Sequence, residues 1–204
     1  MSGDHGDLPV AVRVRQLEDR VIAAGLTTDA ELDRILTGAY WTGSPAHGAR
    51  MVARAWLDPG YRERLLADGN AAAAELGLDT GNRDGSGYRL KAVQNTVQRH
   101  NMVVCTLCSC YPWEMLGLPP VWYKAAPYRS RAVKDPRGVL ADFGVSLPKE
   151  TEIRVWDSTA ETRFLVLPMR PASTDGWSED QLAELVTRDS MIGTGFPKTP
   201  GSSS

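Results

Sequence analysis

The sequence predicts an α+β protein in which a helical N-terminal arm precedes a layered α/β/β/α-like domain. Apolar residues at helical spacing dominate the front of the chain, and short runs of branched apolar residues follow from Leu90 onward. At 204 residues, the chain is long enough for one domain with a substantial core and an arm. We expect the arm at 1–44, the domain at 45–192 and a disordered tail at 193–204.

Two helices are predicted in the arm. Residues 9–24 carry an apolar stripe at mixed three- and four-residue spacing, formed by Val10, Val14, Leu17, Val21 and Ile22. Thr28-Asp29-Ala30-Glu31 has the pattern of a capping box, which opens a second helix through Leu32, Ile35 and Leu36. An apolar stripe on an arm either folds back on its own domain or contacts a partner, and both alternatives stay open.

The front of the domain is predicted to be helical at 46–57 and 60–76. Asp58 is the expected N-cap of the second helix, Pro59 its first residue and Gly77 its stop. A loop is expected at 79–87, because glycine and polar residues dominate that stretch.

The second half of the domain combines strands and helices. Runs of branched apolar residues predict strands at 90–97, 102–104, 152–156 and 163–167. Asp135 is expected to cap a helix that has Pro136 in its first turn and ends at Gly144. Ser178-Glu179-Asp180-Gln181 is a capping box that opens a helix to about Thr187.

All three cysteines lie in one segment, Cys105-Thr106-Leu107-Cys108-Ser109-Cys110, so all three thiols can reach one metal ion. The backbone can bind the same ion, because deprotonated amides of Ser109 and Cys110 would share a plane with the thiolates of Cys108 and Cys110. Cys105 would approach from a perpendicular direction, which leaves one octahedral position open for water or substrate. Deprotonated amides are strong donors to a hard, highly charged ion, so the set suits trivalent iron or cobalt better than zinc.

Three simpler interpretations of the cysteines were weighed. A structural zinc site normally needs four protein ligands, and His100 is the only histidine near the three thiols. A thioredoxin-like pair should open a helix, whereas here Pro112 follows and a third cysteine is left over. Inert buried cysteines are common, but the clustering of three argues against coincidence.

The ten residues from Val104 to Trp113 closely resemble the metal-binding signature of the nitrile hydratase alpha subunit. The resemblance spans roughly residues 45 to 170 and includes 48–50, 55–59, 116–120, 122–124, 128–133, 142–144, 152–158 and 165–168. Thr106, together with Tyr111 and Trp113, is similar to the cobalt type. Two departures, Glu114 in place of the usual Pro and Gln94 in place of the commoner Glu, bear on substrate range rather than on the metal site.

This resemblance implies that residues 45–192 form a metal-binding catalytic domain with one cobalt(III) per chain, favoured over iron(III). The implied metal ligands are Cys105, Cys108, Ser109 and Cys110. Cys108 would be a cysteine-sulfinic acid and Cys110 a cysteine-sulfenic acid, while Cys105 stays a thiolate. Because a sulfenate oxygen can act as base or nucleophile, Cys110 and Ser109 are the expected catalytic residues.

The remaining site residues also follow from the resemblance. Trp113 is expected to line the pocket for an organic nitrile, with a core tryptophan as the alternative. Lys124, Asp157 and Glu161 correspond to polar positions behind the ligands that tune the site, although each taken alone would be a solvated charge. Arg129 and Arg131 are candidates to hold the oxidised sulfurs, with surface ion pairs as their ordinary interpretation.

The implied activity is hydration of a nitrile to its amide, a lyase reaction carried out with a nitrile hydratase beta subunit of one or more chains. A related subunit of thiocyanate hydrolase carries the same cysteine cluster. That family tends to have Arg after Tyr-Pro, whereas Trp113 favours a neutral organic substrate. A non-catalytic homologue for cobalt trafficking or regulation is the third alternative.

Whole-chain properties exclude several other classes. The formal net charge of −2 gives no general attraction to nucleic acid. The apolar runs are far shorter than the roughly eighteen residues of a membrane span, and the polar, acidic start is unlike a secretory signal. Three clustered thiols do not make a disulfide framework. We therefore expect a cytoplasmic protein that acts on a small molecule.

Overall fold

The computed structural model describes residues 10–28, 30–31, 43–81 and 87–201. The chain forms two compact units, Met1–Thr42 and Gly43–Ser204. In the first unit, α1 spans Val10–Ala23, as the apolar stripe predicted. The amide of Glu31 donates to Thr28 Oγ1 over 3.2 Å, which is one half of the predicted capping box. The helix predicted from Leu32 onward lies outside the described residues.

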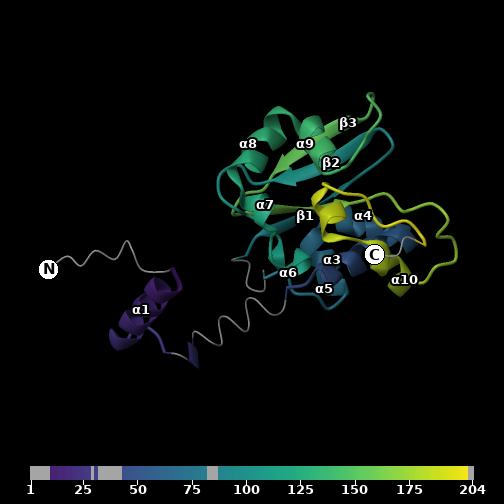
Figure 1. The fold of residues 1–204 in the computed structure, drawn as a ribbon. Coiled ribbons are helices and arrows are strands. Elements are labelled where there is room, and N and C mark those ends of the chain that lie inside the picture. Colours follow the sequence, from purple (N-terminus) through teal and green to yellow (C-terminus); the bar gives the residue numbers. More distant parts are fainter. Residues whose placement is uncertain (1–9, 29, 32–42, 82–86, 202–204) are drawn as a thin grey trace. The chain divides into compact units, whose positions relative to one another are not determined.

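The second unit contains nine helices within the described residues (Figure 1). They are α3 Pro45–Leu57, α4 Pro59–Ala67, α5 Gly69–Glu75, α6 Trp113–Leu116, α7 Val121–Lys124, α8 Ala126–Lys134, α9 Pro136–Asp142, α10 Glu179–Leu185 and α11 Arg188–Ile192. None of the helices in the described part of the chain is long and apolar enough to cross a membrane.

The predicted caps are confirmed, but one predicted helix is in fact two. Asp58 accepts the amide of Tyr61 at 3.0 Å, and Pro59 opens α4. The single helix expected at 60–76 is wrong, because the chain turns at Asp68. There an extended backbone and a carboxylate that accepts two amides start the new helix α5.

In the part of the chain that the structure describes, four strands form two separate parallel pairs. β1 (Arg89–Gln94) pairs with β4 (Thr162–Leu167), and β2 (Arg99–Val104) pairs with β3 (Glu152–Asp157). The two strands in the middle of the chain order thus form one sheet, and the first and last strands form the other. Val104 is aligned with Asp157, so both strands of the second pair end at the same level.

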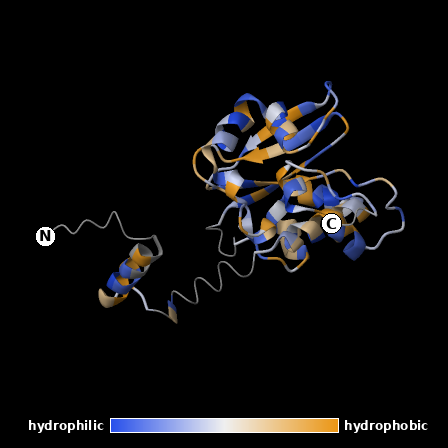
Figure 2. Ribbon diagram, in the orientation of Figure 1, coloured by the Kyte–Doolittle hydropathy of each residue, from blue (hydrophilic) through white to orange (hydrophobic). Residues whose placement is uncertain are grey.

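The elements stack as helix, sheet, sheet and helix, which confirms the predicted α+β class. α4 and α5 pack on β1, the two sheets meet through β2 and β4, and α9 packs on β3. In Figure 2 both the strands and the outer helices combine hydrophobic and hydrophilic residues. The fully buried core between the layers includes Met51, Leu65, Leu90, Met102, Leu140, Leu165 and Leu167.

Residues 193–201 do not form the disordered tail that the sequence predicted. Thr194 is buried, and the amide of Lys198 donates to the carbonyl of Leu185 at 2.8 Å. The turn that directs this segment onto the domain requires Gly193, whose φ is +89° and whose missing Cβ would collide with the carbonyl of Asn101. Composition alone gave no sign of these contacts. Residues 202–204 lie outside the described chain.

Candidate metal centre

The three cysteines meet directly after β2. Cys105 is fully buried, Cys110 is half-buried and Cys108 is exposed. The Sγ atom of Cys108 lies 3.3 Å from that of Cys105 and 3.1 Å from that of Cys110. Within the described residues, these thiols form the one cluster of His, Cys, Asp or Glu side chains that could hold a metal ion, with all three ligand atoms within 4.8 Å of one another.

The pKa values of two of the thiols are shifted in opposite directions. Hydrogen bonds from the thiols of Cys110 and Cys105, and from the backbone amides of Cys110 and Ser109, lower the pKa of Cys108 to about 7. Burial, together with the bond to Cys108, raises the pKa of Cys110 to about 12. The loop thus brings thiols and backbone amides together, the two kinds of donor that a mixed thiolate and amide ligand set uses.

Asp157 anchors the beginning of the cysteine loop. Its carboxylate accepts the amide of Thr106 at 2.9 Å and the hydroxyl of Thr106 at 2.5 Å. Because β2 and β3 are parallel and end together, Asp157 at the end of β3 lies beside the residues that leave β2. Of the three polar positions expected from the resemblance, this is the one that bonds to the loop.

The structure places Lys124 and Glu161 differently. Lys124 is exposed at the end of α7. Glu161 is also exposed and accepts the hydroxyl of Thr159 at 2.9 Å, within its own turn between β3 and β4. Among the described residues, neither side chain forms a hydrogen bond that reaches the cysteines.

Three side chains hold carbonyl groups of the loop, and sequence reasoning missed two of them. Arg129 Nη1 donates to the carbonyl of Cys108 at 2.8 Å, Tyr123 to that of Cys110 at 3.0 Å, and Arg163 Nη1 to that of Tyr111 at 2.8 Å. Arg129 was considered as a holder of sulfur oxygens, whereas Tyr123 and Arg163 carry no local signal. Arg131 has its ordinary role, because it pairs with Asp142 and Asp135.

Trp113 and Glu114 follow the loop at the start of α6. Trp113 is half-buried. Glu114 accepts the hydroxyl of Tyr88 at 2.5 Å, and burial raises the pKa of its carboxyl group. The guanidinium of Arg163 lies 4.0 Å from the centre of the Tyr88 ring. Tyr88 thus binds Glu114 into the domain, and Arg163 covers the ring of that tyrosine.

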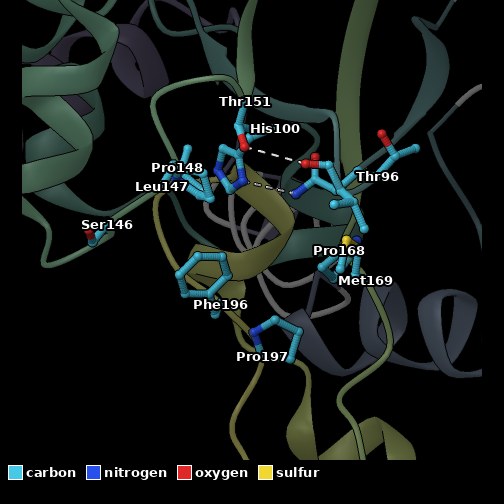
Figure 3. Close-up of a pocket in the computed structure, with 12 residues that line it drawn as sticks. Thr96, His100, Ser146, Leu147, Pro148, Thr151, Pro168, Met169, Phe196 and Pro197 are labelled. Carbon is cyan, nitrogen blue, oxygen red and sulfur yellow. Dashed lines mark hydrogen bonds between the residues drawn. The ribbon is translucent and has the colours of Figure 1, made fainter.

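A cavity of about 260 Å³ lies at the end of β2 opposite the cysteines (Figure 3). His100 is at its centre, next to Asn95 and Phe196. The Nε2–H of His100 donates to the carbonyl of Gly193 at 2.7 Å, so Nδ1 is the acceptor that faces the Asn95 amide at 3.4 Å. Because His100 starts the strand whose end carries Cys105, this cavity is separate from the metal centre.

Three clustered thiols at the end of a parallel strand pair, in an α+β domain, form a site of the kind that thiolate metal-binding proteins use. The family model for the nitrile hydratase alpha chain matches residues 8–195, and the chain belongs to this family. The resemblance inferred from the cysteine motif is therefore confirmed.

Individual relatives agree with this assignment. The chain is 51% identical to the high-molecular weight cobalt-containing nitrile hydratase subunit alpha of Rhodococcus rhodochrous, over 92% of this chain and 91% of that protein. It is 44% identical to the thiocyanate hydrolase subunit gamma of Thiobacillus thioparus, over 95% of this chain and 80% of that protein. A solved structure of recombinant thiocyanate hydrolase with partially modified cobalt centres superposes with a TM-score of 0.87 at 41% identity, over 93% of this chain and 90% of that one.

Proposed function

We propose that this chain is the metal-binding alpha subunit of a cobalt nitrile hydratase, which hydrates an organic nitrile to the corresponding amide. The observation that carries the proposal is the cluster of three thiols, with sulfur atoms within 4.8 Å of one another, in a chain about half identical to subunits named as cobalt-containing. The thiolates of Cys105, Cys108 and Cys110 and the amide nitrogens of Ser109 and Cys110 would hold one cobalt(III). When bound, the ion supplies Lewis-acid chemistry to water or nitrile.

The burial of the thiols supports a different oxidation state for each. Cys108 is exposed and has a lowered pKa, which are the properties of a readily oxidised thiol, so it would reach the sulfinic acid. Cys110 is partly covered and would stop at the sulfenic acid, while the buried Cys105 would remain a thiolate. Each added oxygen takes two electrons from sulfur and comes from an oxidant of the dioxygen or peroxide class.

The residues around the loop would divide the remaining work. A sulfenate oxygen on Cys110 would act as base or nucleophile toward the substrate. Ser109 would contribute its amide nitrogen and its hydroxyl, and Trp113 would form a wall for the organic group. Asp157 would fix the loop through Thr106, and Lys124 and Glu161 would tune the local charge.

The exposed surface around the cysteine loop is suited to contact with a beta subunit. Leu107 in the loop and Val121 at the start of α7 are each 90% exposed, and Leu118 between them in sequence is also exposed. Exposed apolar side chains in and after a functional loop are typical of an interaction surface. Arginine residues of the partner would hold the oxygen atoms of the two oxidised cysteines, because Arg129 of this chain already binds a loop carbonyl.

Thiocyanate hydrolysis is the second candidate, supported by the relative of that name. Trp113, an apolar side chain at the position where that family tends to carry Arg, favours a neutral organic substrate. The test is to co-express the full chain with its beta subunit in cobalt medium and assay a nitrile and thiocyanate side by side. We expect amide formation from the nitrile; turnover of thiocyanate alone would contradict the proposal, as would a cobalt-loaded complex that converts neither.

A further inference from the structure

The contact between Arg129 and the cysteine loop involves a peptide group that belongs to the proposed ligand set. Arg129 Nη1 donates to the carbonyl oxygen of Cys108 at 2.8 Å. This carbonyl and the amide nitrogen of Ser109 belong to the same planar, resonance-coupled peptide unit. When the nitrogen gives up its proton to bind a metal ion, the resulting negative charge is shared with the oxygen. A guanidinium fixed on that oxygen therefore stabilises the nitrogen as a ligand.

The other two side chains that donate to carbonyls of the loop, Arg163 and Tyr123, do not act on a peptide of the ligand set in this way. Arg163 holds the carbonyl of Tyr111 at the same 2.8 Å, but the nitrogen of that peptide belongs to Pro112 and carries no proton. Tyr123 is neutral, and the carbonyl of Cys110 that it holds is joined to the nitrogen of Tyr111, which is outside the ligand set. Of the three, Arg129 alone is a cation that binds a ligand peptide.

The helix that carries Arg129 is anchored to the strand that leads into the cysteine loop. Tyr128, its neighbour on α8, donates its hydroxyl to the carbonyl of Val103 on β2 at 2.6 Å. The Tyr128 ring packs on Trp122 with a centroid distance of 4.8 Å, and Trp122 packs on Phe143 at 4.7 Å. This aromatic cluster fixes α8 against the strand that leads into the loop. The backbone of Arg129 is thus anchored beside the loop, and its guanidinium reaches the Cys108 carbonyl from there.

We propose that Arg129 is a positioning residue that stabilises the Ser109 amide nitrogen as a metal ligand through the Cys108 carbonyl. The inference rests on the proposed function, because it concerns the same metal site. In this inference the positive charge of Arg129 stabilises the deprotonated Ser109 amide, which is a different role from maintaining the conformation of the loop. This role of the charge predicts a change in the donor atoms around the ion, in addition to any change in stability.

The test compares Arg129→Met, Arg129→Lys and the matched control Arg163→Met with the unsubstituted chain. Each is co-expressed with the beta subunit in cobalt medium. Three quantities are measured: cobalt per chain, the rate of cobalt loss to a chelator, and the number of nitrogen donors from cobalt X-ray absorption. We expect Arg129→Met to lose a nitrogen donor and to hold cobalt about 10- to 100-fold more weakly. Arg129→Lys should be intermediate, because it keeps the charge but not the planar fork.

The Arg163→Met control distinguishes the effect of the Arg129 charge on the ligand peptide from a general loss of loop stability. Arg163→Met should lower the melting temperature yet retain the nitrogen donors of the unsubstituted chain. If Arg129→Met shows an unchanged absorption spectrum and unchanged cobalt loss, or if Arg163→Met alters the donor set in the same way, the inference is wrong. If the unsubstituted complex holds no cobalt, the proposed function fails and takes the inference with it.

Discussion

Thr106 donates both its backbone amide and its hydroxyl to the two carboxylate oxygens of Asp157, over 2.9 and 2.5 Å. The two residues are 51 positions apart in sequence and meet because β2 and β3 are parallel and end at the same level. This pair fixes the point at which the chain leaves the sheet. The position of Cys105, directly before Thr106, follows from it.

Replacing Asp157 by Asn should weaken the metal centre more than the fold. An amide has one oxygen acceptor where the carboxylate has two, so one of the two bonds from Thr106 is lost. The site is exposed, and we expect a loss of about 1 kcal/mol or less in unfolding free energy but roughly a 10-fold faster loss of cobalt. Glu152→Gln, at the other end of β3, is the control. Equal cobalt retention in both variants would contradict the role given to Asp157.

Each of Cys105→Ala, Cys108→Ala and Cys110→Ala should abolish both cobalt binding and nitrile hydration. The reason is that all three sulfurs surround one position, so removal of any one leaves the octahedral set incomplete. Elemental analysis of the co-expressed complex is the measurement. Leu107→Ala, in the same loop at 90% exposure, should keep its cobalt. Stoichiometric cobalt in any of the three cysteine variants would remove that residue from the ligand set.

The beta subunit should raise the activity of the purified chain markedly. Two oxidised sulfurs beside exposed Leu107 would otherwise face water, where their hydrogen bonds are weaker and poorly fixed. The measurement is a titration of the chain with beta subunit, in which nitrile hydration and native mass are followed together. Full activity of the monomer, unchanged by the partner, is the opposing result.

Stability should fall as the pH drops below the ordinary pKa of histidine because of His100. Burial lowers the pKa of His100 from its usual 6.5, so the unfolded chain binds a proton that the folded chain resists. The stabilisation is complete above pH 6.5 and decreases as the pH falls toward the folded-state pKa. Urea unfolding at several pH values should show this slope in the parent chain and a flatter one in His100→Gln. Identical slopes would assign the effect to other groups.

Much of the fold follows from local signals. Asp58, Asp135 and Ser178 each cap the helix that their neighbours predict, because a capping bond spans only two or three residues. Helices of four residues, such as α6 and α7, have no repeating apolar pattern to reveal them. The break at Asp68 does have a local signal, because Asp68 can cap a helix and Gly69 and Asn70 are poor helix formers, but the apolar pattern on both sides favoured one continuous helix.

The candidate site also has a part that the sequence predicts and a part that it does not. The cysteine motif is contiguous, so the meeting of its three thiols could be predicted from their spacing. The groups that hold the loop come from distant segments: Tyr123, Arg129 and Arg163 lie 13, 21 and 52 residues from the carbonyls that they bind. No local pattern marks such contacts, since they arise only when α7, α8 and β4 pack around the end of β2.

Metal analysis combined with the intact mass of the Cys105–Cys110 peptide tests the central claim most directly. The active complex should contain about one cobalt per chain, and the peptide should carry about three added oxygen atoms, two on Cys108 and one on Cys110. Fully active protein with stoichiometric zinc, or with three unmodified thiols, would contradict a cobalt centre built on oxidised cysteines.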